Sequence, residues 1–190
     1  SDSLFIKKSE ENRLTFTGEF SKSLNVKKNS ILQALKLFEN VLTDRFSIKL
    51  EKKLPIGAGL GGGSADAAAI IRFITSHCSH PMPSPRAISK IGADVPACVL
   101  SKASRVGGIG ELVRPIDISG IDLWIVLVNP RIFVSTASIF QEVIEKNNEP
   151  LEPFNHFSSS NQFIDYLERQ RNDLQAITVN KCPEINQVLR

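Results

Sequence analysis

The sequence predicts an α+β fold in which short strands alternate with helices. Residues 3–7 and 13–17 are rich in β-forming side chains and flank a charged turn, which indicates two strands. Residues 46–51 alternate apolar and polar side chains, as a half-buried strand does. Residues 64–76 begin with a run of small, alanine-rich residues, and alanine is the best helix former. Local propensity therefore supports mixed α and β structure with antiparallel hairpins.

The composition is that of an ordinary globular protein. The chain has 190 residues, of which 42% are hydrophobic and 23% charged, so one or two domains with a real core are expected. The net charge of +3 comes from scattered Lys and Arg residues and does not indicate nucleic-acid binding. No apolar run has membrane-spanning length. The three cysteines are few and odd in number, which does not suit a disulfide scaffold. A reducing cytosol fits this sparse set of cysteines better than a disulfide-bonded fold.

The other elements follow from the same patterns. Apolar spacing predicts a helix over about 30–43, with Asn29 or Ser30 as its N-cap. The remaining predictions, in chain order, are a proline-rich loop over 77–88, two strands within 102–116, a buried strand over 123–128, a helix from 134 to about 145, a helix starting near Ser160 and a final helix from 183. His77, Cys78 and His80 fit no zinc template, so no metal site is predicted among them.

The chain is organised around a glycine-rich stretch that runs into the helix predicted over 64–76. Five of its eleven glycines lie between Gly57 and Gly63. A glycine loop that leads into a helix N-terminus presents unpaired N–H groups, and such groups bind phosphate. A P-loop is excluded because Gly63 stands where that motif needs Lys, and a dinucleotide-binding fingerprint lacks its buried strand and its acidic residue. From spacing alone, a plain surface loop before a core helix stays open.

The stretch Leu-Pro-x-Gly-x-Gly-Leu-Gly-Gly-Gly-Ser-Ala-Asp-Ala, which starts at Leu54, resembles the phosphate-binding motif of the GHMP kinases. Its triple glycine resembles the branch that phosphorylates 4-diphosphocytidyl-2-C-methyl-D-erythritol in the non-mevalonate route to isoprenoids. Gly-Ala-Asp-Val-Pro, at 92–96, resembles a second motif of that branch. The resemblance implies that ATP binds with Mg²⁺ at Pro55, Ile56, Gly57, Ala58, Gly59, Leu60, Gly61, Gly62, Gly63, Ser64 and Ala65.

Individual side chains have two interpretations each. Asp94 precedes Val-Pro as a helix cap would, but the resemblance implies that Asp94 is the acidic catalytic residue. Ser64 is a plausible N-cap, and in the kinase its hydroxyl would also reach a phosphate oxygen or Mg²⁺. Thr136 and Phe140 resemble substrate-binding positions, with the aromatic ring facing the cytosine, while a capping Thr and a core Phe remain equally open.

The resemblance implies a two-domain GHMP kinase fold. Residues 1–120 would form a ribosomal-protein-S5-like ATP-binding domain, and residues 121–190 an incomplete ferredoxin-like domain. The family's catalytic Lys would lie before residue 1 and its third glycine motif after Arg190, so we expect the chain to be the middle of such a kinase. The expected activity is ATP-dependent phosphorylation of the substrate's 2-hydroxyl, by a monomer or weak homodimer in a bacterial cytoplasm or plastid stroma. Another GHMP small-molecule kinase and a non-catalytic nucleotide-binding fragment are the alternatives.

Overall fold

The computed structural model describes residues 1–26, 29–130, 132–145, 148–154 and 156–189. These residues form two compact units. Unit 1 contains Ser1–Ile56 and Leu60–Ile116, and unit 2 contains Gly57–Gly59 and Asp117–Arg190. Within the described ranges, no helix combines the length and the apolar character that crossing a lipid bilayer requires.

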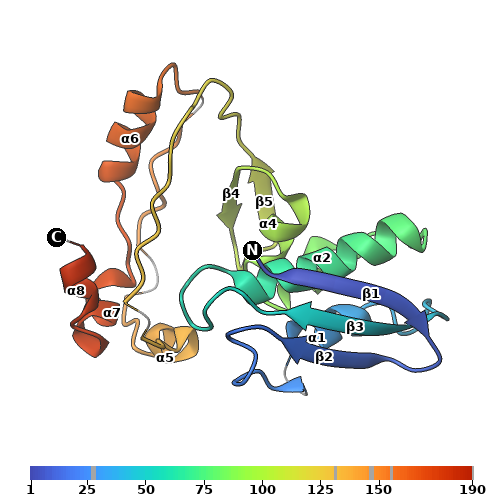
Figure 1. The fold of residues 1–190 in the computed structure, drawn as a ribbon. Helices are drawn as coiled ribbons and strands as arrows, with labels where there is room; N and C mark the ends of the chain where they lie inside the picture. Colours follow the sequence, from blue (N-terminus) through green and yellow to red (C-terminus); the bar gives the residue numbers. More distant parts are fainter. Residues whose placement is uncertain (27–28, 131, 146–147, 155, 190) are drawn as a thin grey trace. The chain divides into compact units, whose positions relative to one another are not determined.

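Unit 1 is built on a three-stranded sheet of β1 (Ser3–Ser9), β3 (Arg45–Glu51) and β2 (Arg13–Thr17), in that order (Figure 1). The three strands are confirmed, but a hairpin between the first two is wrong, because β3 pairs antiparallel with β1 and parallel with β2. β3 carries the most regular apolar alternation, and the side chains of its inward face are at most 2% exposed. The central position, which has a neighbouring strand on both sides, gives that face the deepest burial.

Helices α1 (Ser30–Lys36) and α2 (Gly62–His77) pack against the sheet and against each other. Asn29 Oδ1 accepts a hydrogen bond of 2.9 Å from the amide of Ile31, which confirms Asn29 as the N-cap of α1. The helix ends at Lys36, earlier than the predicted 43, and the chain continues in turns. The core of unit 1 consists of Leu14, Ile31, Ala34, Leu35, Phe38, Phe46, Ile48, Leu50, Ala67, Ala68, Ile70, Ile71, Ile74, Ile88 and Val95.

Two short helices and a hairpin complete unit 1. Helix α3 (Pro85–Ser89) replaces part of the predicted loop, because Ser84 caps it and Pro85 is tolerated in the first turn. Helix α4 (Val95–Leu100) starts where the sequence predicts a helix. Strands β4 (Ser104–Gly107) and β5 (Leu112–Pro115) form the expected antiparallel pair.

Unit 2 consists of α5 (Thr136–Gln141), α6 (Ser160–Glu168), α7 (Gln175–Lys181), α8 (Ile185–Val188) and extended segments between them. Ser159, the neighbour of the predicted Ser160, caps α6. Four aromatic rings gather beside this helix, with neighbouring centroids 4.7–5.3 Å apart, and belong to Phe154, Phe157, Phe163 and Tyr166. Their edge-to-face and tilted contacts form a small apolar centre for the unit.

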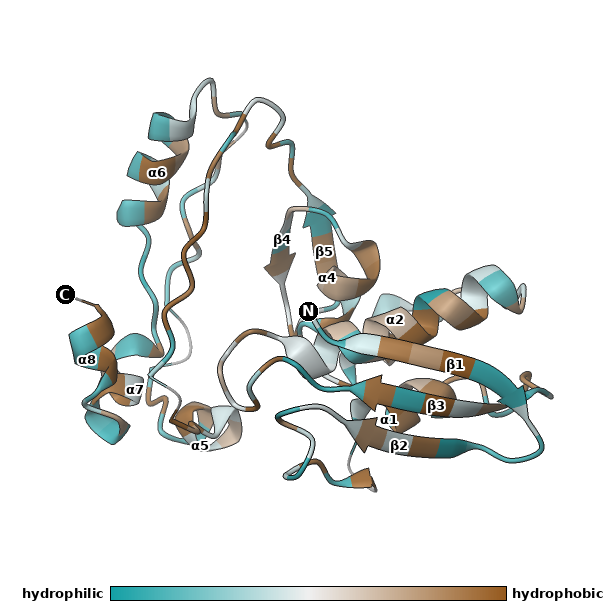
Figure 2. Ribbon diagram, in the orientation of Figure 1, coloured by the Kyte–Doolittle hydropathy of each residue, from teal (hydrophilic) through white to brown (hydrophobic). Residues whose placement is uncertain are grey.

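The prediction of a buried strand over 123–128 is wrong. This run forms no regular structure and is exposed, with 98% of Trp124 accessible. Figure 2 shows it as a continuous hydrophobic stretch between β5 and α5. An apolar run predicts burial only where another strand pairs with it, and none does so within the described residues. The helix predicted from 134 to 145 is also shorter and ends at Gln141.

Candidate functional site

The glycine-rich stretch leads directly into α2. Gly57 and Gly59 both have φ of +71°, and Gly61, at the N-cap, has φ of +65°, so all three adopt the left-handed conformation that favours glycine. Ser64 lies in the first turn of the helix and not at the cap, so its predicted capping role is wrong. The helix begins two residues earlier than expected because Gly61 turns the chain into the helical direction without a side chain.

The N-terminus of α2 has the features of an anion site. The helix is 16 residues long, and Gly61 offers no side chain that could occupy the first amide groups. The amide of Ala65 is bonded to the carbonyl oxygen of Gly61 at 2.9 Å, the first bond of the helical ladder. The N–H groups before it point out of the helix, where the helix dipole is also positive. Phosphate is the ligand that this arrangement suits.

Asp94 lies directly before α4 with an exposed side chain. It has helical backbone angles (φ −84°, ψ −14°) and makes no capping hydrogen bond through its carboxylate. The turn around it is closed by the bond from the amide of Val95 to the carbonyl oxygen of Gly92, at 3.0 Å. The capping role favoured by local pattern is therefore absent, and the carboxylate faces solvent.

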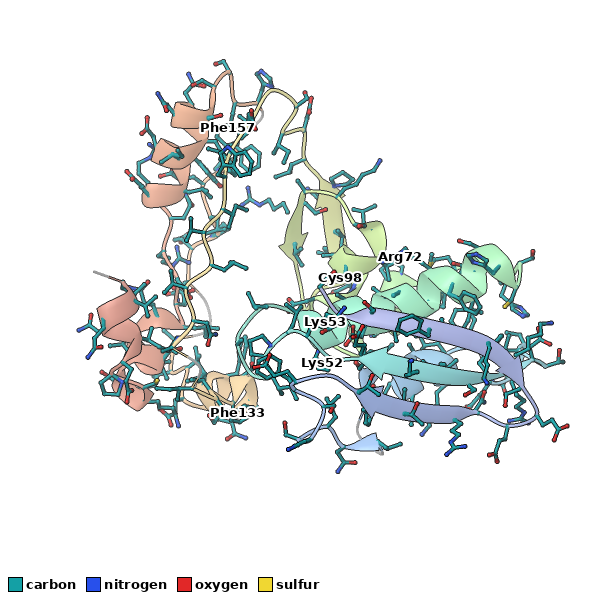
Figure 3. All side chains as sticks on the ribbon, in the orientation of Figure 1. Lys52, Lys53, Arg72, Cys98, Phe133 and Phe157 are labelled. Atoms are coloured by element: carbon teal, nitrogen blue, oxygen red, sulfur yellow. The ribbon has the colours of Figure 1, made fainter. Side chains whose placement is uncertain are left out.

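The two sequence motifs adjoin in unit 1. A methyl group added at Gly92 would lie 3.7 Å from the hydroxyl oxygen of Ser64. Helix α4 packs on α2, and the guanidinium of Arg72 on α2 donates to the carbonyl oxygen of Cys98 on α4 (Figure 3). The exposed carboxylate of Asp94 therefore belongs to a segment that adjoins the first turn of α2, the helix terminus suited to phosphate.

A buried lysine lies beneath the first turn of α2. The ammonium of Lys52 contacts Asp2 Oδ2 and is 3.2 Å from Asp66 Oδ2, and these three side chains are 5%, 4% and 8% exposed. Asp2 Oδ1 also accepts from the amides of Lys53 and Leu54, at 2.7 and 2.8 Å. We call Lys52, Asp2 and Asp66 the lysine cluster (Figure 3 labels Lys52). It joins the sheet to the glycine-rich stretch.

Burial and hydrogen bonding act oppositely on the two carboxyls of the lysine cluster. Burial raises the pKa of Asp66, the charge of Asp2 adds to this, and Lys52 opposes it without cancelling it. Burial also acts to raise the pKa of Asp2, but the hydrogen bonds from Lys52 and two backbone amides outweigh it and leave that pKa lowered. Sequence reasoning missed this cluster. The alternation of β3 contained the signal, since continuing it by two residues from Leu50 places Lys52 on the buried face.

The predicted substrate residues lie on α5 in unit 2. Ser135 caps this helix by accepting from the amide of Ser138 at 3.3 Å, so Thr136 is not the cap. Phe140 is 56% exposed, so it is not a core residue. A cavity of about 380 Å³ in this unit is lined by neither of them. Within the described residues, no three His, Cys, Asp or Glu side chains form a group that could hold a metal ion.

Comparison with known proteins identifies the class. The family model for the GHMP kinases N terminal domain matches residues 29–107, which contain both motifs. A relative from Chelativorans sp. is 33% identical over 196 residues, covering 100% of this chain and 67% of its own. The chain therefore belongs to the GHMP kinase family.

Its curated relatives are named 4-diphosphocytidyl-2-C-methyl-D-erythritol kinase. The one from Cereibacter sphaeroides is 37% identical over 139 residues, covering 73% of this chain and 50% of its own, so the chain spans about half the length of such relatives. A crystal structure of 4-(cytidine 5'-diphospho)-2C-methyl-D-erythritol kinase has a TM-score of 0.67 at 24% identity, over 98% of this chain and 67% of that one. Homoserine kinase from Cytophaga hutchinsonii has a TM-score of 0.54 at 15% identity, over 88% and 55%. These structures confirm the α+β GHMP kinase fold.

Proposed function

We propose that the protein transfers the terminal phosphoryl group of ATP to the 2-hydroxyl of 4-diphosphocytidyl-2-C-methyl-D-erythritol, a step of isoprenoid precursor biosynthesis. The observation that carries the proposal is the contact between the two motifs, in which Gly92 adjoins Ser64 and Asp94 stands exposed beside them. The names of the relatives supply the substrate. Such a reaction would take place in a bacterial cytoplasm or a plastid stroma.

The phosphates of ATP would bind along Pro55–Ala65, with the amides at the start of α2 as donors. Asp94 would orient or deprotonate the attacking hydroxyl, and its exposure leaves it accessible to a substrate. Phosphoryl transfer depends mostly on positioning and on charge stabilisation, which this arrangement provides. A second cationic group, expected from the family resemblance, would complete the stabilisation.

Mg²⁺ fits the donors that unit 1 offers. In phosphoryl-transfer sites this ion takes one or two protein ligands, and phosphates and water supply the others. The hydroxyl of Ser64 and the carboxylate of Asp94 are oxygen donors on adjoining segments. When bound, the ion would neutralise phosphate charge, while the helix terminus orients the chain of phosphates.

We propose a division of labour along the chain, with residues 1–120 binding ATP and residues 121–190 belonging to a C-terminal domain. Unit 1 ends at Ile116 and the main segment of unit 2 begins at Asp117, which supports a domain boundary near residue 120. The exposed ring of Phe140 supports a role in stacking on cytosine, and Thr136 lies on the same helix.

The test is ADP release from Mg-ATP by the full-length protein, with and without 4-diphosphocytidyl-2-C-methyl-D-erythritol, and with homoserine as a control acceptor. Asp94→Asn should lower kcat by about 10²–10⁴-fold while ATP affinity is retained. Asp117→Asn is the matched control, since Asp117 is an exposed carboxylate that accepts from the amide of Ser119 in its own turn. Near-normal turnover in Asp94→Asn would remove Asp94 from the mechanism, and ADP release independent of the cytidine substrate would refute the substrate assignment.

A further inference from the structure

The turn between β4 and β5 contacts the backbone that precedes Asp94. Gly110 is buried and has φ of +101°. A methyl group added there would collide with the carbonyl oxygen of Ala93 and would lie 2.6 and 2.7 Å from its carbonyl carbon and Cα. The two backbones can be this close only because residue 110 has no side chain. An ordinary turn between two strands needs no such contact.

The turn itself is closed by local hydrogen bonds. The amide of Gly110 donates to the carbonyl oxygen of Gly107 at 3.1 Å, and the amide of Ile109 donates to Glu111 Oε2 at 2.7 Å. Gly108, with φ of +65°, supplies the second left-handed residue. Because the turn is satisfied by its own bonds, it offers Ala93 a fixed surface.

The segment that carries Asp94 is therefore close to two other parts of unit 1. A methyl group added at Gly92 would lie 3.7 Å from the hydroxyl oxygen of Ser64, and the backbone of Ala93 lies against Gly110. The carboxylate of Asp94, the next residue in the chain, makes no capping bond of its own that would fix its direction. Its placement relative to the start of α2 must come from the backbone on either side.

We propose that Gly110 is a positioning residue for Asp94. By bringing the hairpin turn against the Ala93 peptide, it sets where the carboxylate stands relative to Ser64. The inference rests on the proposed function only for the role of Asp94, since the backbone contact itself lies within unit 1.

The test compares Gly110→Ala with Gly107→Ala in the full-length protein. Gly107 belongs to the same hairpin, and a methyl group there would meet Leu112 Cβ at an ordinary 3.8 Å. Displacing a catalytic group by about 1 Å costs about 10²-fold, so we expect kcat of Gly110→Ala to fall about 10–100-fold, with KM for ATP changed less than about threefold. Gly107→Ala should keep kcat within about threefold of the wild type.

A double variant separates positioning from general damage. If Gly110 acts through Asp94, adding Gly110→Ala to Asp94→Asn should lower kcat by less than about threefold more, because interacting residues are not additive. An equal kcat for Gly110→Ala and Gly107→Ala would overturn the inference. Full additivity with Asp94→Asn would also overturn it, since Gly110 would then act elsewhere.

Hydrogen–deuterium exchange gives a readout that does not depend on activity. Amides of residues 92–95 should exchange faster in Gly110→Ala than in Gly107→Ala, while amides of β1–β3 stay protected in both. If these amides exchange equally in the two variants, the inference fails. If the wild type releases no substrate-dependent ADP, the proposed function fails, and exchange still decides whether Gly110 positions the Asp94 segment.

Discussion

Replacing Lys52 with Met should destabilise the protein more than any other single lysine substitution near the glycine-rich stretch. The change removes the ammonium between Asp2 and Asp66 and leaves two carboxyl side chains that are 4% and 8% exposed facing each other. Removing one partner of a buried ion pair costs about 3–5 kcal/mol, because the remaining charge stays buried without compensation. That is a large part of the about 5–15 kcal/mol that stabilises an ordinary domain.

The adjacent Lys53→Met is the matched control. Lys53 Nζ lies 2.9 Å from Glu51 Oε2, with side chains 52% and 35% exposed. An exposed pair of this kind contributes about 0–1 kcal/mol. With an m value of about 2 kcal/mol/M in urea, the unfolding midpoint should fall by about 1.5–2.5 M for Lys52→Met and by less than about 0.5 M for Lys53→Met.

The loss of unfolding free energy in Lys52→Met should depend on pH. Without the ammonium, nothing offsets the burial and the charge of Asp2 that raise the folded-state pKa of Asp66, so the native state is penalised as pH rises through about 4 and is relieved below it. The deficit should be largest at pH 7 and smaller near pH 4, and Asp66→Asn added to Lys52→Met should restore part of it. A loss below about 1 kcal/mol, or an equal loss at both pH values, would refute the buried-charge explanation.

Two further predictions concern α2. In Gly62→Ala the methyl group would lie 3.0 Å from the ammonium of Lys52, so the free energy of unfolding should fall by about 1–3 kcal/mol. In Gly63→Ala the nearest contact would be 3.6 Å, and the lower backbone entropy of alanine in the unfolded chain should raise the free energy of unfolding by up to about 1 kcal/mol. Thermal unfolding measures both, and a reversed order would contradict the packing. Arg72→Met removes the charged donor to the Cys98 carbonyl and should cost about 1–3 kcal/mol, whereas Arg86→Met on the exposed side of α3 should cost less than about 0.5 kcal/mol. Equal losses by urea unfolding would show that the bond to Cys98 does not stabilise α4.

Local patterns predicted the elements of unit 1 well. The alternation over 46–51, the helix start at Asn29 and the helix that follows the glycine stretch are all confirmed, because each depends on neighbouring residues only. The order of strands is different, since a pattern of period two says which face is buried but not which strand lies alongside. A hairpin between the first two strands was the simplest assumption, and β3 occupies the place between them.

The features that set the geometry of the site could not be read locally. The contact of Gly110 with Ala93 and that of Gly92 with Ser64 join residues far apart in the sequence. The run over 123–128 also shows that local composition is not enough. Its apolar residues predict a buried strand, but burial of such a strand depends on pairing with another strand. Ser64 is not the N-cap of α2, because Gly61 adopts the left-handed conformation and occupies the cap position three residues earlier.

Under the proposed function, the contacts of unit 1 would make phosphate transfer and substrate choice separable. Helix α2 carries the proposed phosphate-binding site at its start, is joined through Asp66 to Lys52 just after β3, and donates from Arg72 to α4. The placement of Asp94, the proposed catalytic residue, relative to the start of α2 is therefore set within unit 1, whereas the proposed substrate residues lie on α5 in unit 2. Changes on α5 should then alter which hydroxyl compound is accepted and leave the transfer geometry intact.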